Sequence, residues 1–289
     1  MIKQKLKPFT PKIVRKIYRG ATNYFKRLWR WLVILKQIRG VTFLDQMKLV
    51  FSALLSPITS LKSLLKWQNP VLLFDTGVYV KGNGTFNVRK YTDDLWHILP
   101  NREANVYKCI KERLTIGSVF VDAGANIGVY SILASSIVGD EGKVISIEMI
   151  PLTIKRLKKH IMMNNQQNIN IIEQALSDTK DETIVANVPN NKYGMASIEI
   201  IHNGIETESV KVMTTTLSHV LANVDKVDLM KMDIEGAELK ALQGGEDVLD
   251  KVENIIFETH TQLAEISSFL TLHGFKLMKL SGRDVLAYK

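Results

Sequence analysis

The second half of the chain alternates between short apolar runs and segments with helical periodicity. The apolar runs, which suit strands buried on both faces, predict five strands, at Val119–Asp122, Val144–Ile147, Ile169–Ile172, Val227–Met232 and Asn254–Glu258. The intervening segments predict four helices, at Val129–Ser136, Leu152–Met163, Glu235–Gln243 and Gln262–Leu272. Two last runs, Lys276–Leu280 and Val285–Tyr288, are close enough to form an antiparallel hairpin. This alternation is typical of an α/β fold with a mostly parallel sheet.

Two parts of the chain depart from that alternation. Residues 183–213 contain three further β-like pieces, which indicate a structured insertion rather than a long bare loop. Before the alternation begins, β-like runs at Val71–Val80 and Thr85–Arg89 precede a helical stretch at Arg102–Arg113. We therefore predict a helical extension over residues 1–66, an accessory lead-in over 67–117 and the α/β domain over 118–289.

The net charge of +9 comes from the extension alone. Residues 1–44 hold 12 Lys or Arg and no acidic residue, which leaves 26 basic and 29 acidic residues in the rest of the chain. A mildly acidic body argues against a nucleic-acid-binding face on the α/β domain. We therefore expect no nucleic-acid partner.

Apolar residues in the extension recur at spacings of three and four, which predicts one stripe along a helix. The stripe consists of Val14, Ile17, Ala21, Tyr24, Leu28, Trp31, Leu35 and Ile38. The other faces carry Lys12, Arg15, Lys16, Arg19, Lys26, Arg27, Arg30, Lys36 and Arg39. A coiled coil would have uniformly positive flanks, so residues 12–39 suit an anionic membrane surface better. Packing of the stripe onto the protein's own body and binding to nucleic acid are the alternatives.

Hydropathy limits how the chain relates to a membrane. No uncharged run reaches the roughly 18 residues that a spanning helix needs. The apolar stretch Trp31–Leu35 is too short for a signal-peptide core, and the lone Cys109 has no partner for a disulfide. The sequence therefore predicts a cytoplasmic protein, peripheral at the inner face of the membrane, and it leaves the oligomeric state open.

The loop after the first predicted strand combines an acid with two glycines. Asp122, Gly124 and Gly128 follow a buried apolar run, and glycine allows a sharp turn and close approach of a ligand. Their spacing differs from the Gly-x-Gly-x-x-Gly of dinucleotide dehydrogenases. A carboxylate would repel a pyrophosphate, whereas it suits the ammonium and sulfonium of S-adenosylmethionine. The pattern thus disfavours the alternative of a nicotinamide-dependent oxidoreductase.

A second acid ends the second predicted strand. Glu148 is placed to accept hydrogen bonds from the two hydroxyls of a ribose. Taken singly, Asp122 is equally well read as a helix cap and Glu148 as a solvated surface acid. Together they converge on the carboxyl ends of two neighbouring strands and predict a site for S-adenosylmethionine.

Four stretches together resemble the FkbM-type methyltransferase family over about residues 100–262. They are FVDAGANIGVY (Phe120–Tyr130), Glu148 with Pro151, ALSD (Ala175–Asp178) and KMDIEGAE (Lys231–Glu238). The resemblance implies a Rossmann-like class I methyltransferase sheet of seven strands, S-adenosylmethionine as donor, and a hydroxyl acceptor on a sugar or polyketide-like molecule. It adds Asn126 to the cofactor site and makes Gln174, Ala175 and Asp178 the candidates to face adenine. The chain departs from the family's pattern at Met149, usually Pro, and at His160, usually Asn.

Candidate catalytic residues follow the fourth and fifth predicted strands. An alcohol is a poor nucleophile at neutral pH, so a positioned base accelerates its methylation. We predict Asp233 or His260 as the base, with Glu235 and Lys231 orienting the acceptor. The structural alternatives are that Glu235 and Glu238 are first-turn helix acids, and that Lys231 is a buried partner of Asp233.

The same region bears on metal binding and on the acceptor. Asp233, Glu235, Glu258 and His260 offer hard ligands but lack a metal-type spacing, so no metal is predicted. The chain lacks the Asn/Asp-Pro-Pro-aromatic turn of enzymes that methylate base nitrogens, which favours O-methylation of a small molecule or glycan. The insertion around residues 190–195 is expected to cover that acceptor. A non-catalytic module that binds S-adenosylmethionine is the remaining alternative.

Overall fold

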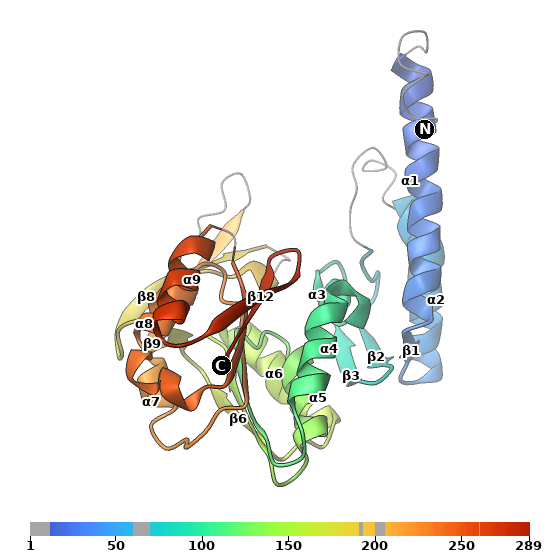
Figure 1. Ribbon diagram of the computed structural model, residues 1–289. Coiled ribbons are helices and arrows are strands. Elements are labelled where there is room, and N and C mark those ends of the chain that lie inside the picture. The colour runs from blue at the N-terminus through green and yellow to red at the C-terminus, as the bar shows by residue number, and fades with distance from the viewer. Residues whose placement is uncertain (1–11, 60–69, 191–192, 200–205, 260) are drawn as a thin grey trace. The chain divides into compact units, whose positions relative to one another are not determined.

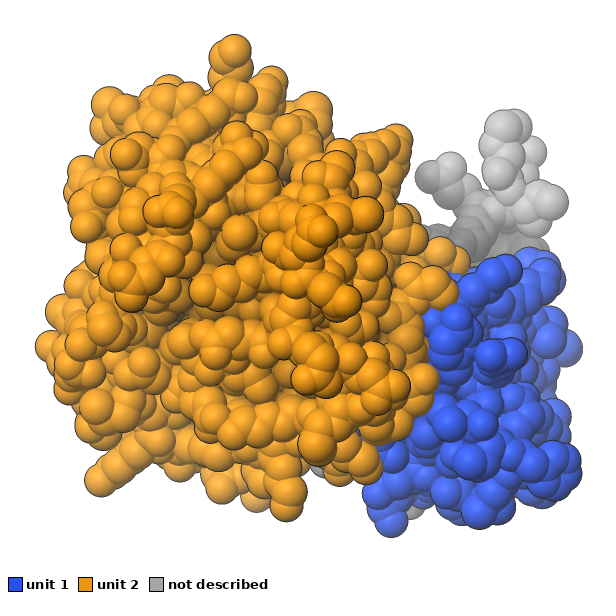
Figure 2. All heavy atoms as spheres, turned by 90° about the horizontal axis from the view of Figure 1, so that it is seen from below, with its two compact units in different colours: residues 1–81, 87–99 blue, residues 82–86, 100–289 orange. Residues whose placement is uncertain are grey.

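The computed structural model describes residues 12–59, 70–190, 193–199, 206–259 and 261–289 (Figure 1). The chain forms two compact units (Figure 2). One unit contains residues 1–81 and 87–99, and the other contains residues 82–86 and 100–289. The predicted extension and most of the predicted lead-in therefore belong to one unit, which is described separately below.

The larger unit is built on one seven-stranded sheet. Its strands are β4 (Val119–Ala123), β5 (Lys143–Ile147), β6 (Ile169–Ile172), β10 (Leu229–Met232), β11 (Asn254–Glu258), β12 (Lys276–Ser281) and β13 (Asp284–Tyr288). Their order is β12-β13-β11-β10-β4-β5-β6, and β13 is the one strand that runs opposite to the other six. The predicted α/β sheet with its C-terminal hairpin is confirmed. The order in which the chain adds strands to the sheet reverses between β4 and β10. Sheets of this kind bind ligands at such a point.

Helices cover both faces of this sheet (Figure 1). One face carries α4 (Ala104–Arg113), preceded by the 3-10 turn η2 (Pro100–Glu103), with α5 (Val129–Val138) and α6 (Pro151–Met163). The other face carries α7 (Leu217–Val220), α8 (Glu238–Gln243), η4 (Glu246–Lys251) and α9 (Leu263–Leu272). Fully buried Met230, Met232 and Phe257 from the central strands pack against Leu242 and Ile266 of the second layer. This core fixes the strand ends that carry the site.

Two predicted boundaries in this unit were wrong. The helix expected from Glu235 begins at Glu238, because Glu235 and Gly236 have positive φ angles of 49° and 100° that end helical geometry. The fourth strand begins at Leu229, because Val227 makes only an isolated bridge to Val252.

Within its described residues the insertion contains two strands. β8 (Thr183–Pro189) and β9 (Thr207–Thr215) pair antiparallel, and β9 also pairs with β7 (Ala175–Leu176). Between them lie the 3-10 turn η3 (Tyr193–Met195) and a single bridge from Ser197 to Asn187. The predicted structured insertion is therefore present.

The smaller unit packs two helices onto a short sheet. Its elements are α1 (Lys12–Leu35), β1 (Ile38–Gly40), α2 (Phe43–Thr59), β2 (Thr76–Val80), α3 (Asp94–His97) and the end of β3 (Gly84–Val88). Ile38 belongs to a strand paired with Val80, so its predicted place on the helical stripe was wrong. Gly40 allows the turn there, because a Cβ would lie 2.1 Å from the Gln46 nitrogen. Within the described ranges, no helix is both long and apolar enough to cross a membrane.

Candidate active site

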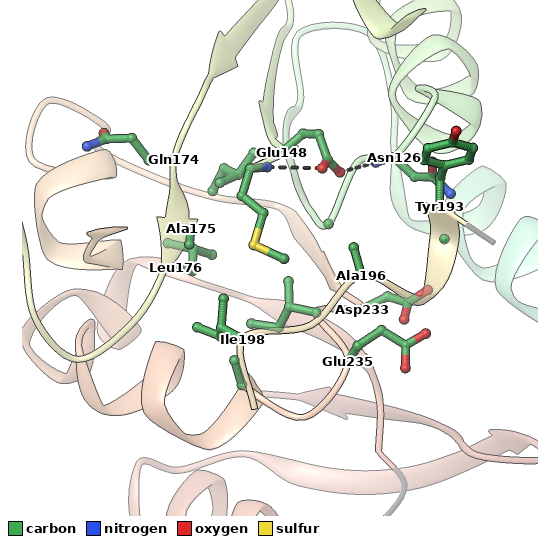
Figure 3. Close-up of a pocket in the computed structure, with 16 residues that line it drawn as sticks. Asn126, Glu148, Gln174, Ala175, Leu176, Tyr193, Ala196, Ile198, Asp233 and Glu235 are labelled. Atoms are coloured by element: carbon green, nitrogen blue, oxygen red, sulfur yellow. Dashed lines mark hydrogen bonds between the residues drawn. The ribbon is translucent and has the colours of Figure 1, made fainter. Parts of the chain in front are cut away.

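A pocket opens at the carboxyl ends of β4, β5 and β10, where the strand order reverses (Figure 3). It encloses about 520 Å³ of space not filled by atoms, part of which is open to solvent. Seven of the predicted site residues line it, namely Gly124, Asn126, Glu148, Gln174, Ala175, Asp233 and Glu235.

The loop from β4 to α5 forms one wall of the pocket. Gly124 has a φ of +80°, and a Cβ on it would lie 1.9 Å from the carbonyl oxygen of Asp233. The backbone N–H of Asn126, itself at a φ of +48°, donates to Glu148 Oε2 at 2.9 Å. Glycine at position 124 therefore lets the loops after β4 and β10 touch at the pocket.

Gly124→Ala should destabilise the fold by at least about 2 kcal/mol, since it adds a steric clash to an unfavourable backbone conformation. Gly117→Ala is the matched control, because Gly117 has a φ of +85° but open space around the Cβ position. Denaturant unfolding of both variants measures the difference. Equal losses of stability would show that the contact between the two loops contributes nothing.

Glu148 is held rigidly in the pocket wall. Its Oε1 accepts hydrogen bonds from the backbone N–H groups of Met149 and Ile150 at 3.0 and 2.9 Å, and its Oε2 accepts the bond from Asn126. Burial raises the pKa of this carboxyl to about 7, although the three backbone donors act to lower it. The alternative interpretation of Glu148 as a solvated surface acid was wrong.

Three predicted cofactor residues do not line the pocket. Asp122 is completely buried and accepts a hydrogen bond from Ser131 Oγ at 2.6 Å. Gly128 begins α5, and a Cβ there would lie 2.5 Å from Leu157 Cδ1, so helix packing explains this glycine. Asp178 lies exposed beside Ser177, whose hydroxyl donates to it at 2.9 Å. Contact of these residues with a cofactor stays a prediction.

Lys231 lies next to the pocket in a cluster of carboxylates. It pairs in register with Asp122 on β4, and its Nζ lies 3.1 Å from Asp233 Oδ2 and 4.8 Å from the centre of the Tyr130 ring. Burial lowers the pKa of Lys231, but the charges of Asp233, Asp122 and Glu103 outweigh it and raise the pKa overall. The alternative interpretation of Lys231 as a buried partner of Asp233 is confirmed.

The cluster includes one acid that sequence reasoning missed. The hydroxyl of Tyr130 donates to Glu103, which lies at the end of η2. No sequence signal distinguishes Glu103, since it lies outside every motif, in the segment before the predicted α/β domain.

A strained turn presents Glu235 to the pocket. Glu238 holds this turn, because its carboxylate accepts hydrogen bonds from the backbone N–H groups of Ile234 and Gly236 at 3.1 Å each. Burial raises the pKa of Glu235 to about 8, and the negative charges of Asp233 and Glu258 add to the shift. Glu238 is thus the first-turn acid of α8, whereas Glu235 lines the pocket.

Most apolar residues of the pocket were missed by sequence reasoning, which pointed only to residues 190–195 of the insertion. Ile147, Met149 and Leu176 line it, as do Tyr193, Gly194, Ala196 and Ile198 of the insertion. The Ser197 hydroxyl donates to the carbonyl oxygen of Glu235 at 2.7 Å, which fastens the insertion to the strained turn. Apolar residues at a pocket look like core residues in a sequence, so only the insertion as a whole gave a signal.

Strand β11 ends with one more acid, Glu258, whose charge acts on Glu235 of the pocket. Burial raises the pKa of Glu258 to about 7, with Asp233 and Asp284 contributing. His260 lies outside the described residues, so its predicted role as base stays a prediction. Across the part of the chain that the structure describes, no three His, Cys, Asp or Glu side chains are grouped as a metal site.

Comparison with known proteins identifies the family. The sequence profile of the methyltransferase FkbM domain matches residues 122–277, more than half of the chain. The chain belongs to the FkbM methyltransferase family. This membership confirms the family that the sequence resembles, the seven-stranded sheet agrees with the predicted class I fold, and S-adenosylmethionine is confirmed as the cofactor.

Relatives in the family and fold are distant. Methyltransferase sdnD of Sordaria araneosa is 28% identical over 169 residues, which cover 48% of this chain and 65% of that protein. A probable cobalt-precorrin-6B C(15)-methyltransferase of Sulfolobus acidocaldarius is 32% identical over 88 residues, 29% of this chain and 46% of that protein. The crystal structure of methyltransferase FkbM from Methylobacillus flagellatus superposes with a TM-score of 0.43 at 14% identity, covering 96% of this chain and 60% of that one. The chain thus spans between about half and two thirds of the curated relatives' length.

Proposed function

We propose that this protein transfers the methyl group of S-adenosylmethionine to a hydroxyl of an uncharged sugar or glycan. The observation that carries the proposal is the composition of the pocket. Apolar side chains and the fixed carboxylate of Glu148 form one part of it, and the carboxylates of Asp233 and Glu235 lie together at another (Figure 3).

The first part suits the adenosine portion of the cofactor. Ile147, Met149 and Leu176 offer apolar surface for an adenine ring, and Glu148 retains acceptor capacity for ribose hydroxyls. Asp233, the ion-pair partner of Lys231, adds negative charge, which favours a cofactor with a sulfonium and an ammonium. When bound, S-adenosylmethionine supplies an electrophilic methyl group.

The second part favours a hydroxyl acceptor. Carboxyl groups form hydrogen bonds with hydroxyls in either protonation state, and ionised ones repel phosphates, so Asp233 and Glu235 suit a neutral polyol and oppose a nucleic acid. Walls from the insertion, such as Tyr193 and Ala196, lie at the same pocket and would contact the acceptor. Excluding water from an in-line methyl transfer also improves the alignment of the reacting atoms.

We assign the role of base to Glu235. In the reaction the acceptor oxygen forms a bond to the methyl carbon, the carbon–sulfur bond breaks with its electron pair on sulfur, and the hydroxyl proton passes to a carboxylate. Asp233 is engaged with Lys231, whereas Glu235 has a pKa near the working pH, as a general base requires. Lys231 holds the Asp233 carboxylate in place through their 3.1 Å contact.

The assignment predicts a pH dependence of turnover. Glu235 acts in its deprotonated form, so kcat should rise with pH through about 8 and level off above it. The rise should be missing in the Glu235→Gln variant. A wild-type profile that is flat between pH 6 and pH 9 would exclude a carboxylate of this pKa as the base.

The acceptor class is tested in cells. Mass spectrometry of glycans from cells with and without the protein should find species that differ by one methyl group, carried as an ether on a sugar oxygen. Absence of any such difference, with methylated nucleic acid or protein in its place, would contradict the proposal. Binding of S-adenosylmethionine without any methylated product would favour a non-catalytic module.

A further inference from the structure

Helix α1 has apolar side chains on two opposite faces. Trp31 and Ile34 are only 2% and 1% exposed, and they pack into the smaller unit. Tyr18, Phe25, Trp29 and Leu32, which we call the outer stripe, are between 57% and 74% exposed. Successive residues are about 100° apart around a helix, which places the outer stripe opposite Trp31 and Ile34. The face with Trp31 and Ile34 is therefore part of the folded core, whereas the outer stripe remains exposed.

This arrangement corrects the stripe predicted from sequence. Trp31 and Ile38 of that stripe are buried, so packing on the protein's own body accounts for them. Of its other members, Leu28 and Leu35 are half-buried. Val14 of the predicted stripe is 47% exposed, so the exposed apolar surface overlaps the predicted stripe at that end, whereas Tyr18, Phe25, Trp29 and Leu32 were not part of it.

Helix α2 repeats the pattern beside α1 (Figure 1). Leu49 and Ala53 are buried, whereas Leu44, Phe51 and Leu55 are exposed. Scattered apolar residues are ordinary on a surface, but large apolar side chains aligned on two packed helices mark an interaction surface.

The basic residues around the outer stripe of α1 indicate which kind of partner this surface fits. Residues 1–44 contain no acid, and two lysines are exposed near the outer stripe, Lys26 on α1 and Lys36 in the turn directly after it. A second copy of α1 laid against the first would bring only like charges together, which disfavours self-association. An anionic lipid surface offers the opposite charge and also accepts apolar and aromatic side chains, as an interfacial helix requires.

We propose that the outer stripe of α1 docks the protein onto the surface of a membrane that contains anionic lipids. Phe25, Trp29 and Leu32 enter the boundary between headgroups and acyl chains, and Lys26 and Lys36 contact the headgroups. Trp31 and Ile34 stay packed in the protein, so docking requires no unfolding of the smaller unit. The inference does not depend on the acceptor or on the reaction.

Vesicle co-sedimentation of the full-length protein tests the docking. Vesicles of phosphatidylcholine alone are compared with vesicles that also contain phosphatidylglycerol, at low and high salt. The wild type should bind the anionic vesicles, and salt should weaken the binding. The double variant Phe25→Ser and Trp29→Ser should bind at least about tenfold more weakly.

Two matched controls separate docking from general effects. Ile116→Ser with Leu272→Ser removes equally exposed apolar side chains from the larger unit and should leave vesicle binding unchanged. Lys26→Glu with Lys36→Glu should abolish the preference for anionic vesicles, whereas Lys155→Glu with Lys159→Glu on α6 should keep it. Unchanged melting temperatures of all four double variants confirm that they fold.

Three results would overturn the inference. One is equal binding of anionic vesicles by the wild type and by the double variant Phe25→Ser and Trp29→Ser, which we call the outer-stripe variant. Equal binding to both kinds of vesicle is another. Light scattering that shows a wild-type dimer which the outer-stripe variant dissociates, without vesicle binding by either, would assign the surface to a second copy of the chain.

Discussion

Glu235→Gln should lower the rate of methyl transfer by about 10²–10⁴-fold, the usual contribution of a positioned base. The variant keeps the shape of the side chain and an acceptor oxygen, so the affinity for S-adenosylmethionine should stay close to that of the wild type. Burial and the neighbouring acids already favour the neutral form of Glu235 near neutral pH, so the neutral glutamine should not lower the melting temperature. Single-turnover kinetics and calorimetry measure the two effects separately.

Comparison with other variants separates the base from residues that orient the acceptor. Asp233→Asn removes the partner of buried Lys231 and should lower both stability and turnover. His260→Ala tests the role that the sequence suggests for that residue. If either variant abolishes turnover while Glu235→Gln retains it, the base is not Glu235.

Glu148→Ala should weaken the binding of S-adenosylmethionine by at least tenfold. Hydrogen bonds to a charged group contribute about 1.5–3 kcal/mol, which corresponds to roughly 10- to 150-fold in affinity. The substitution also leaves three backbone N–H groups without their acceptor, so some loss of stability should accompany it. Calorimetry at a temperature well below the melting transition measures the affinity.

Glu148→Gln separates the two effects, since it keeps an acceptor for the backbone while it removes the charge. Glu173→Ala is the matched control, because Glu173 lies just beyond β6 at the surface, where it pairs with Lys158. Wild-type affinity in both Glu148 variants would show that the pocket is not the cofactor site.

The strands of the larger unit could be predicted because buried parallel strands require unbroken apolar runs. Part of the pocket lining could be predicted because Gly124 and Glu148 leave a recognisable pattern at two strand ends. The start of α8 could not, since a left-handed Glu235 depends on the hydrogen bonds from Ile234 and Gly236 to Glu238. Local sequence does not reveal such bonds.

The site and the extension show two further limits. Met149 and Ile198 line the pocket, yet in the sequence they resemble core residues, because burial and ligand contact favour the same side chains. Helix α1 carries more apolar residues than one face can hold, and its periodicity alone does not say which face packs inward. Trp29 and Trp31 are only two residues apart and point to opposite sides of the helix, and only the fold decides which of the two is buried.

The central claim is that this pocket holds S-adenosylmethionine and directs its methyl group to a sugar hydroxyl. The most direct test incubates the purified full-length protein with S-adenosylmethionine carrying an isotopically labelled methyl group and a glycan extract from cells that lack the protein. The account predicts label in neutral glycans as a base-stable methyl ether, at least about 100-fold less with Glu235→Gln, and none with a Glu148 variant that no longer binds the cofactor. Label in nucleic acid or protein alone, or equal labelling by the wild type and Glu235→Gln, would contradict it.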